Sequence, residues 1–185
     1  MKVDVNNKLS LDELIDNIEP KKSVVCRRVL GDYKDDFEKL PGSRTKHQDW
    51  EGGLCDHIEE TMNIACVLFD SLNDRRKLPF TLSEALFMLF FHDFDKVIRY
   101  GHRDEFDLIG IDHHGLGNIV VKLIRDKYNY QFSDIEINTL RYVHGENEDY
   151  HSTNRVMLPL TAFVHCCDIV SARIWYDQGK DSARW

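Results

Sequence analysis

The sequence predicts an all-α fold, a single compact helical bundle. Apolar residues recur at the three- and four-residue spacing of buried helix faces. Three segments have the Ser/Thr-x-x-Glu pattern that caps helix N-termini, and each precedes such an apolar run. No sustained alternation of apolar and polar residues indicates a strand.

The length of the chain suits one domain. At 185 residues it can bury a substantial core, and neither an internal repeat nor a low-complexity segment divides it. We therefore expect a single domain over residues 1–185. Within it, residues 1–42 form a helical and loop extension, and residues 43–173 form the core.

The first fifty residues predict short helical pieces and a loop. A capping box at residues 10–13 opens a short helix, and Pro20 is expected to break the chain after it. Residues 21–50 contain Pro41, Gly42 and many charges. They predict a short helix or extended piece that leads into a loop.

Two helices follow that carry residues of chemical interest. Helical spacing of apolar residues from Gly53 onward predicts a helix that ends near Leu72. A second capping box, at residues 81–84, opens a helix that is expected to contain His92 and Asp93. This helix is apolar on nearly every side, which is typical of a position in the core.

The second half of the chain is expected to return to helix after a loop. Residues 101–117 are rich in Asp, His and Gly, which predicts a loop with a short helix at 104–111. A third capping box opens one of the helices that follow. These three helices are expected at 119–127, 133–144 and 158–176.

The charge balance limits the possible partners. A formal charge of −8 and a pI of about 5.5 argue against a broad surface for nucleic acid or an anionic membrane. A local basic pocket is still compatible with the sequence, because Lys96, Arg99, His102 and Arg103 cluster; the alternative is a solvated helix end. We expect a small-molecule partner and no extended nucleic-acid surface.

The chain has no pattern of a secretory or membrane protein. Its first residues are polar, and no apolar run approaches the roughly 20 residues that span a bilayer. Five cysteines without a Cys-x-x-Cys pair are expected to be free, buried thiols rather than a zinc knuckle. These features predict a cytoplasmic protein, or one of the host cytoplasm if a phage encodes it.

The dipeptide His92-Asp93 is the most informative motif, because it follows a run of seven apolar residues. A packed core tolerates an imidazole or a carboxylate only when a partner satisfies it. A divalent cation is such a partner, since neutral imidazole and ionised carboxylate are its usual ligands. Further ligand-type residues lie beside apolar segments elsewhere in the chain: His57, His114, His144 and Asp168.

Three segments together resemble the HD-domain metal-dependent phosphohydrolase superfamily. They read Gly-Gly-Leu-Cys-Asp-His at 52–57, Leu-Phe-Phe-His-Asp-Phe-Asp-Lys at 89–96 and Phe-Val-His-Cys-Cys-Asp-Ile-Val at 163–170. The resemblance spans about residues 43–173. It implies an HD-type helical bundle with a metal site in its centre.

The resemblance also implies the ligands of that metal: His57, His92, Asp93 and Asp168. In members that hold two ions, His114 and His144 would complete the second site; contact with a substrate phosphate is the other role open to them. Such a ligand set accepts Mn, Co, Fe, Ni, Zn or Mg, so one or two divalent ions per chain are expected without a preferred element.

Further residues are expected to act on the substrate. The resemblance gives Asp93 a catalytic role and favours Lys96 as a partner of the substrate phosphate, although a lysine that only ends the helix fits the sequence equally well. The loop before the first ligand supplies candidate substrate contacts, with Trp50 offering either base stacking or a packed anchor. These candidates are Arg44, Lys46, His47 and Trp50.

The resemblance implies a hydrolase of phosphate ester or anhydride bonds that acts on nucleotides with a metal-activated water. The brevity of the chain favours a compact, phage-type (deoxy)nucleoside mono- or triphosphate phosphohydrolase. A phosphodiesterase or 3′–5′ exonuclease of the same superfamily and a noncatalytic nucleotide sensor are the alternatives. A homo-oligomer is also open, because residues 174–176 form an apolar, aromatic helix end.

Overall fold

The computed structural model describes residues 8–106, 108–111 and 113–175, and only the backbone of residues 113 and 114. The described residues form helices and loops without a strand, so the predicted all-α bundle is confirmed. The α-helices are α1 (Leu11–Asp16), α2 (Pro20–Asp32), α3 (Lys34–Lys39), α4 (Gly53–Arg75), α5 (Leu82–Phe91), α6 (His113–Tyr128), α7 (Asp134–Tyr142) and α8 (Pro159–Ile169). Shorter turns are the π-helical η1 (Val97–Gly101) and η4 (Val170–Ile174) and the 3₁₀ segments η2 (Arg103–Glu105) and η3 (Asn147–Asp149).

All three predicted capping boxes are present. The side chains of Ser10, Thr81 and Ser133 each accept a hydrogen bond from the backbone amide three residues later, and the glutamate at that later position bonds back to the cap. These reciprocal bonds satisfy amides that would otherwise lack a partner at the first turn. They fix the starts of α1, α5 and α7.

The prediction for residues 21–50 was wrong in one respect. Pro20 begins α2 instead of only ending the previous helix, and α3 follows almost directly. Proline suits the first turn of a helix because its missing N–H has no partner there and its φ angle is already helical. The expected loop is therefore confined to residues 40–52.

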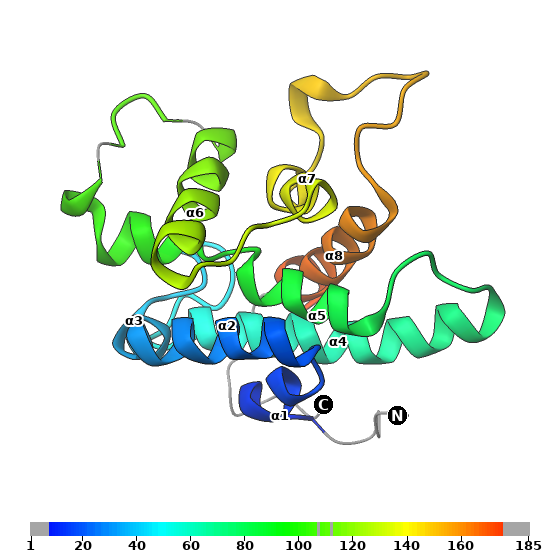
Figure 1. Cartoon of the computed structure of the whole chain (residues 1–185), viewed down its shortest axis with the longest axis horizontal. Helices are drawn as coiled ribbons and strands as arrows, with labels where there is room; N and C mark the ends of the chain where they lie inside the picture. The colour runs from blue at the N-terminus through cyan, green and yellow to red at the C-terminus, as the bar shows by residue number, and fades with distance from the viewer. Residues whose placement is uncertain (1–7, 107, 112, 176–185) are drawn as a thin grey trace.

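Helix α5, whose residues 85–91 are all buried, lies in the middle of the bundle, and the long α4 runs beneath it to the right-hand edge of Figure 1. This long helix packs against α1, α3, α5 and α8, and α7 packs against α8 and α5. Segments far apart in the sequence are thereby brought to one place: the start of α4, the end of α5 and the end of α8. The predicted metal ligands belong to these three segments.

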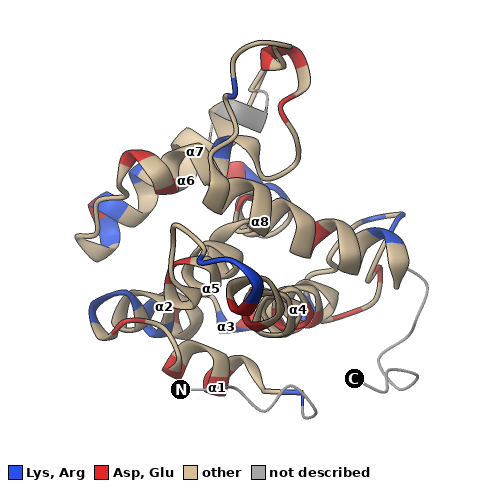
Figure 2. Ribbon diagram, turned by 90° about the vertical axis from the view of Figure 1, so that its right-hand side faces the viewer, with Lys and Arg blue, Asp and Glu red and all other residues tan. Residues whose placement is uncertain are grey.

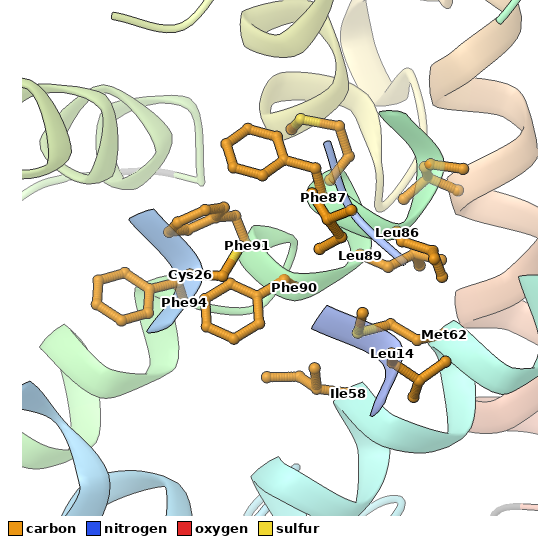
Figure 3. Packing of buried hydrophobic residues seen from close by; sticks show 14 of the residues in the cluster. Leu14, Cys26, Ile58, Met62, Leu86, Phe87, Leu89, Phe90, Phe91 and Phe94 are labelled. Atoms are coloured by element: carbon orange, nitrogen blue, oxygen red, sulfur yellow. The ribbon is translucent and has the colours of Figure 1, made fainter. Parts of the chain in front are cut away.

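A phenylalanine cluster holds the end of α5 in position (Figure 3). Phe87, Phe90, Phe91 and Phe94 are fully buried, and they form edge-to-face and tilted ring contacts with one another and with neighbours. Such pairs add to the free energy of apolar burial. The cluster fixes the backbone on both sides of His92.

His92 and Asp93 were expected to lie within a continuous helix, and this prediction was wrong. Helix α5 ends at Phe91, and a turn follows in which the amides of Phe94 and Lys96 bond to carbonyls three residues earlier. The His92 ring donates from Nδ1 to the carbonyl of Leu89 at 2.6 Å. This bond gives a carbonyl at the helix end a side-chain partner, which is how a helix terminates without unsatisfied groups.

Two other boundaries differ from the expectation. Helix α6 begins at His113, within the predicted loop, and only η2 replaces the helix expected at 104–111. Buried Leu116 shows why, because packing of this turn outweighs the weak helix propensity of the neighbouring glycines. The last helix is divided, since α8 passes into the π-helical η4 at Val170; the predicted end at Tyr176 lies outside the described residues.

An ion pair joins the partly exposed Lys22 of α2 to the buried Glu136 of α7. The Nζ atom of Lys22 lies 2.7 Å from Oε1 of Glu136, which also accepts a hydrogen bond from Tyr130. Burial alone would raise the pKa of Glu136, but Lys22 and the Ser133 amide stabilise the carboxylate more strongly and hold the pKa below its ordinary 4.5. Stability from this pair is therefore present above that value and lost as pH falls through the lower pKa of the folded state.

We expect Lys22→Met to lower the free energy of unfolding by about 2 kcal/mol at neutral pH, because a charged hydrogen bond is lost while packing on Phe87 is kept. Urea unfolding at a series of pH values measures this difference. The difference in the free energy of unfolding between wild type and Lys22→Met should shrink in acid, as Glu136 becomes protonated. A gap that is independent of pH would contradict the assigned role of the ion pair.

Surface charge, the hydropathy of the helices and the state of the cysteines can be compared with the expectations from the sequence. Figure 2 shows both acidic and basic positions on most helices. Among the described residues, no helix is long and apolar enough to cross a bilayer. None of the five cysteines is in a disulfide; Cys26, Cys66 and Cys167 are buried as expected, whereas Cys166 is exposed and Cys55 partly so.

Candidate metal centre

Three of the predicted ligands meet in the middle of the bundle. His57 lies in the second turn of α4, His92 follows the end of α5, and Asp168 lies near the end of α8. All three are buried, and each offers a ligand atom within 4.8 Å of the other two. This buried group can hold a metal ion.

The separations of the donor atoms suit a divalent cation. Nε2 of His57 lies 3.2 Å from Nε2 of His92 and 3.3 Å from Oδ1 of Asp168. Ligands at about 2.1 Å from one ion, in tetrahedral or octahedral arrangement, are roughly 3.0 to 3.4 Å apart. The observed distances fall in that interval.

The hydrogen bonds of the two imidazoles leave the facing nitrogens available. The Nδ1 atom of His92 must carry a proton, because its partner at 2.6 Å is the Leu89 carbonyl. The Nδ1 atom of His57 lies 2.9 Å from Oγ of Ser171, whose own proton is donated to Glu60, so His57 is the donor there too. Both rings therefore direct Nε2 into the same space, which is the usual arrangement of histidines that ligate a metal.

The pKa values describe how the charges are shared when no cation is bound. Burial lowers the pKa of His92 to about 4, so its Nε2 is unprotonated at neutral pH. Burial also acts to lower the pKa of His57, but hydrogen bonds to Asp168 and Asp93 raise it overall. A proton on Nε2 of His57 would occupy the position between the carboxylates that a cation would take, and metal binding would release it.

Asp93 lies against both histidines. Its Oδ2 atom is 3.3 Å from Nε2 of His57 and 3.4 Å from Nε2 of His92, and it pairs with the ammonium of Lys96. Burial opposes ionisation of Asp93, but the positive charge of Lys96 and the histidines hold its pKa well below the usual range. Its second oxygen, Oδ1, is buried without a hydrogen-bond partner among the described residues. A buried carboxylate oxygen in this condition is an unused ligand atom.

The two histidines expected to complete a second site differ in what the structure describes. Nδ1 of His144 lies 3.3 Å from Oδ2 of Asp168, and its Nε2 lies 3.5 Å from Oδ1 of Asp93. His144 is therefore part of the same cluster of side chains. His114 lies in the first turn of α6, and its side chain is outside the described residues.

A cavity of about 300 Å³ opens beside this cluster. Asp93, His144 and Asp168 form part of its wall, so the cluster is in contact with the space that a ligand would occupy. The wall also carries several cationic side chains. They are Lys46, Lys96, Arg99 and Arg173.

These four cationic side chains differ in whether a carboxylate forms an ion pair with them. Lys96 pairs with Asp93, and Arg99 pairs with Asp95 at 2.9 Å. Lys46 and Arg173 have no ion-pair partner within the part of the chain that the structure describes. The cavity wall thus combines buried carboxylates with two cationic side chains that lack such a partner among the described residues, an arrangement suited to an anion bound beside a metal.

The loop before α4 divides the predicted substrate residues into two groups. Lys46 and His47 line the cavity, and the His47 ring lies over that of His57 with 4.6 Å between their centroids. Arg44 instead stacks on Tyr100, and the indole of Trp50 donates to Asp56 at 2.8 Å. Trp50 therefore has a structural partner in the first turn of α4, as in the anchor interpretation of the sequence.

The two glycines of the first motif have a steric explanation. Gly52 has a φ of 77°, in the left-handed region that favours glycine. A Cβ atom on Gly53 would lie 2.0 Å from the carbonyl oxygen of Gln48, far closer than any real contact. Glycine at this position lets Gln48, which is buried, approach the start of α4 and the residues around His57.

Sequence reasoning did not identify four residues around the cluster. Gln48, Glu60 and Ser171 form the hydrogen-bond network behind His57, and Arg173 lines the cavity. The three-residue spacings from His57 to Glu60 and from Asp168 to Ser171 are compatible with one helix face but are too common to single these residues out, and no sequence signal indicated Gln48 or Arg173. No family model, curated protein or solved structure matches this chain.

Proposed function

We propose that the protein is a metal-dependent phosphohydrolase that acts on small nucleotides, a (deoxy)nucleoside mono- or triphosphate phosphohydrolase. One observation carries the proposal: a buried group of two imidazoles and two carboxylates opens onto a cavity whose wall carries lysine and arginine side chains. Imidazole and carboxylate donors suit a catalytic divalent ion, and lysine and arginine suit phosphate. The resemblance of segments 52–57, 89–96 and 163–170 to the HD-domain superfamily supports the same reaction class.

His57, His92, Asp93 and Asp168 would hold the ion, with His144 as an additional donor. A divalent ion bound there supplies a water of lowered pKa and a positive charge beside a phosphate oxygen. His57 and His92 are held by their Nδ1 hydrogen bonds, so neither ring has to reorient when its Nε2 is used. This fixed orientation reduces the cost of reorganisation during the reaction.

The cationic residues of the cavity wall are assigned to the substrate. Lys96 lies next to Asp93 and can neutralise charge that develops on a phosphate oxygen. Lys46 and Arg173 are free to pair with phosphates farther from the bond that breaks. His47, whose Nδ1 lies 2.6 Å from the Gln48 side chain, presents its other nitrogen for a hydrogen bond with substrate.

The size of the cavity favours a small substrate over a polynucleotide. Its volume of about 300 Å³ lies at the lower end of the roughly 300 to 1,000 Å³ range of small-molecule sites. The formal charge of −8 also disfavours a long polyanion. The exonuclease alternative is therefore the weaker of the two hydrolytic hypotheses.

The proposal predicts turnover when the purified protein is incubated with Mn²⁺, Mg²⁺, Co²⁺ or Zn²⁺ and a panel of ribo- and deoxynucleoside mono- and triphosphates. Chromatography identifies the products: nucleoside with phosphate indicates a nucleotidase, and nucleoside with triphosphate indicates a triphosphohydrolase. A chelator should abolish the reaction. Nucleotide binding without product under every metal would refute the enzyme and leave the noncatalytic sensor.

A further inference from the structure

A chain of hydrogen bonds runs behind His57, on the side away from the cavity. The His57 ring donates from Nδ1 to Oγ of Ser171 at 2.9 Å, and the Ser171 hydroxyl donates to Oε2 of Glu60 at 2.5 Å. The side-chain amide of Gln48 donates to the same Glu60 oxygen at 2.9 Å and to Ser171 Oγ at 3.2 Å. Every polar atom between the imidazole and the carboxylate thus has a partner.

The direction of these bonds is determined by chemistry. Glu60, as a carboxylate, can only accept hydrogen bonds, so the Ser171 hydroxyl donates its one proton to Glu60. Only the lone pairs of the Ser171 oxygen are then left for His57. The imidazole must then carry its proton on Nδ1. This leaves Nε2, the nitrogen that faces His92, Asp93 and Asp168, as the atom available to a cation.

The fold builds this chain from three separate places. Ser171 is completely buried in the π-helical η4, where the wider turn follows directly on α8 and its Asp168. Such π-helical turns are often found at functional sites. Gln48 has a left-handed φ of 41°, which is rare for a residue with a side chain, and glycine at position 53 leaves room for it.

We infer that Ser171 and Glu60 are positioning residues that hold His57 in its metal-binding tautomer, with Gln48 fixing the carboxylate. The inference rests on the proposed metal-dependent function. Partners of this kind on a ligating histidine typically change metal affinity by about 10- to 100-fold. Neither residue lines the cavity, so neither is expected to contact substrate.

The inference is tested by calorimetric titration of the metal-free protein with Mn²⁺. Ser171→Ala and Glu60→Ala should each weaken binding by about 10- to 100-fold. The double variant should be no weaker than the weaker single variant, because both changes interrupt one chain. Glu60→Gln, whose amide oxygen still accepts from Ser171, should recover part of the affinity.

Thr139→Val is the matched control. Thr139 is also a fully buried hydroxyl, but its partners are the Ile135 carbonyl and the Thr161 hydroxyl, at 3.0 Å each, and neither belongs to the cluster around His57. It should lower stability without changing the Mn²⁺ dissociation constant. The visible spectrum of the Co²⁺ protein gives a second readout, since a misoriented His57 changes the ligand field in the Ser171 variant but not in the control.

The outcomes separate this inference from the proposed function. Wild type that binds Mn²⁺, with Ser171→Ala and Glu60→Ala binding equally well, would overturn the positioning role and leave the metal centre intact. An equal loss of affinity in Thr139→Val would also overturn it, because the effect would then follow from stability. Wild type that binds no divalent ion would refute the metal-dependent function itself.

Discussion

His92→Ala is expected to abolish turnover and metal binding while the protein stays folded. The substitution removes a ligand nitrogen that is buried, unprotonated at neutral pH and 3.2 Å from Nε2 of His57. The loss of Mn²⁺ affinity should exceed the roughly 100-fold that removal of an outer hydrogen-bond partner costs. The loss in kcat should be on the order of 10³-fold or more.

Calorimetry, product analysis and circular dichroism on the same preparation check this expectation. His151→Ala is the matched control, because His151 is exposed in the loop after η3 and bonds only to Thr153 among the described residues. The control should bind Mn²⁺ and turn over substrate like the wild type. A folded His92→Ala protein with full activity would refute the ligand assignment.

Lys96→Met is expected to separate catalysis from metal binding. Loss of the ammonium should lower kcat/KM by about 10²-fold, because charge on the substrate phosphate is no longer neutralised. Affinity for Mn²⁺ should stay the same or increase. The reason is that Lys96 pairs with Asp93 Oδ2 and therefore competes with a cation for that oxygen.

The measurement is a Mn²⁺ titration beside steady-state kinetics, with Lys34→Met as the control for loss of a lysine. Lys34 is exposed on α3 and pairs only loosely with Glu38, at 3.6 Å. Weaker Mn²⁺ binding by Lys96→Met at unchanged kcat would show that the lysine only supports the fold of the site. Unchanged Mn²⁺ affinity together with unchanged kcat/KM would show that Lys96 has no role in the reaction.

Local signals predicted the starts of α1, α5 and α7. The capping boxes at Ser10, Thr81 and Ser133 formed as expected because they depend only on residues three apart. Helix ends were predicted less well, since the end of α5 depends on the His92 ring reaching the Leu89 carbonyl. The start of α6 similarly depends on burial of Leu116, a tertiary effect that composition does not reveal.

The residues of the candidate site also divide into those that local sequence patterns predicted and those that only the fold brings together. His57, His92 and Asp168 could be grouped from the sequence because ligand-type side chains in apolar helices require a partner. Ser171 and Glu60 could not, since a serine or glutamate on a helix is ordinary until the fold places it behind a ligand. The arginine of the cavity wall was also predicted wrongly: Arg173 lies in the wall, whereas Arg44, the arginine expected from the sequence, stacks on Tyr100.

The most direct test of the metal centre is an anomalous difference map from crystals grown with Mn²⁺ and measured above and below the manganese absorption edge. We predict a peak bounded by Nε2 of His57, Nε2 of His92 and the Asp168 carboxylate, with Asp93 beside it. A fully occupied peak elsewhere, or none at this position in protein saturated with Mn²⁺, would contradict the account.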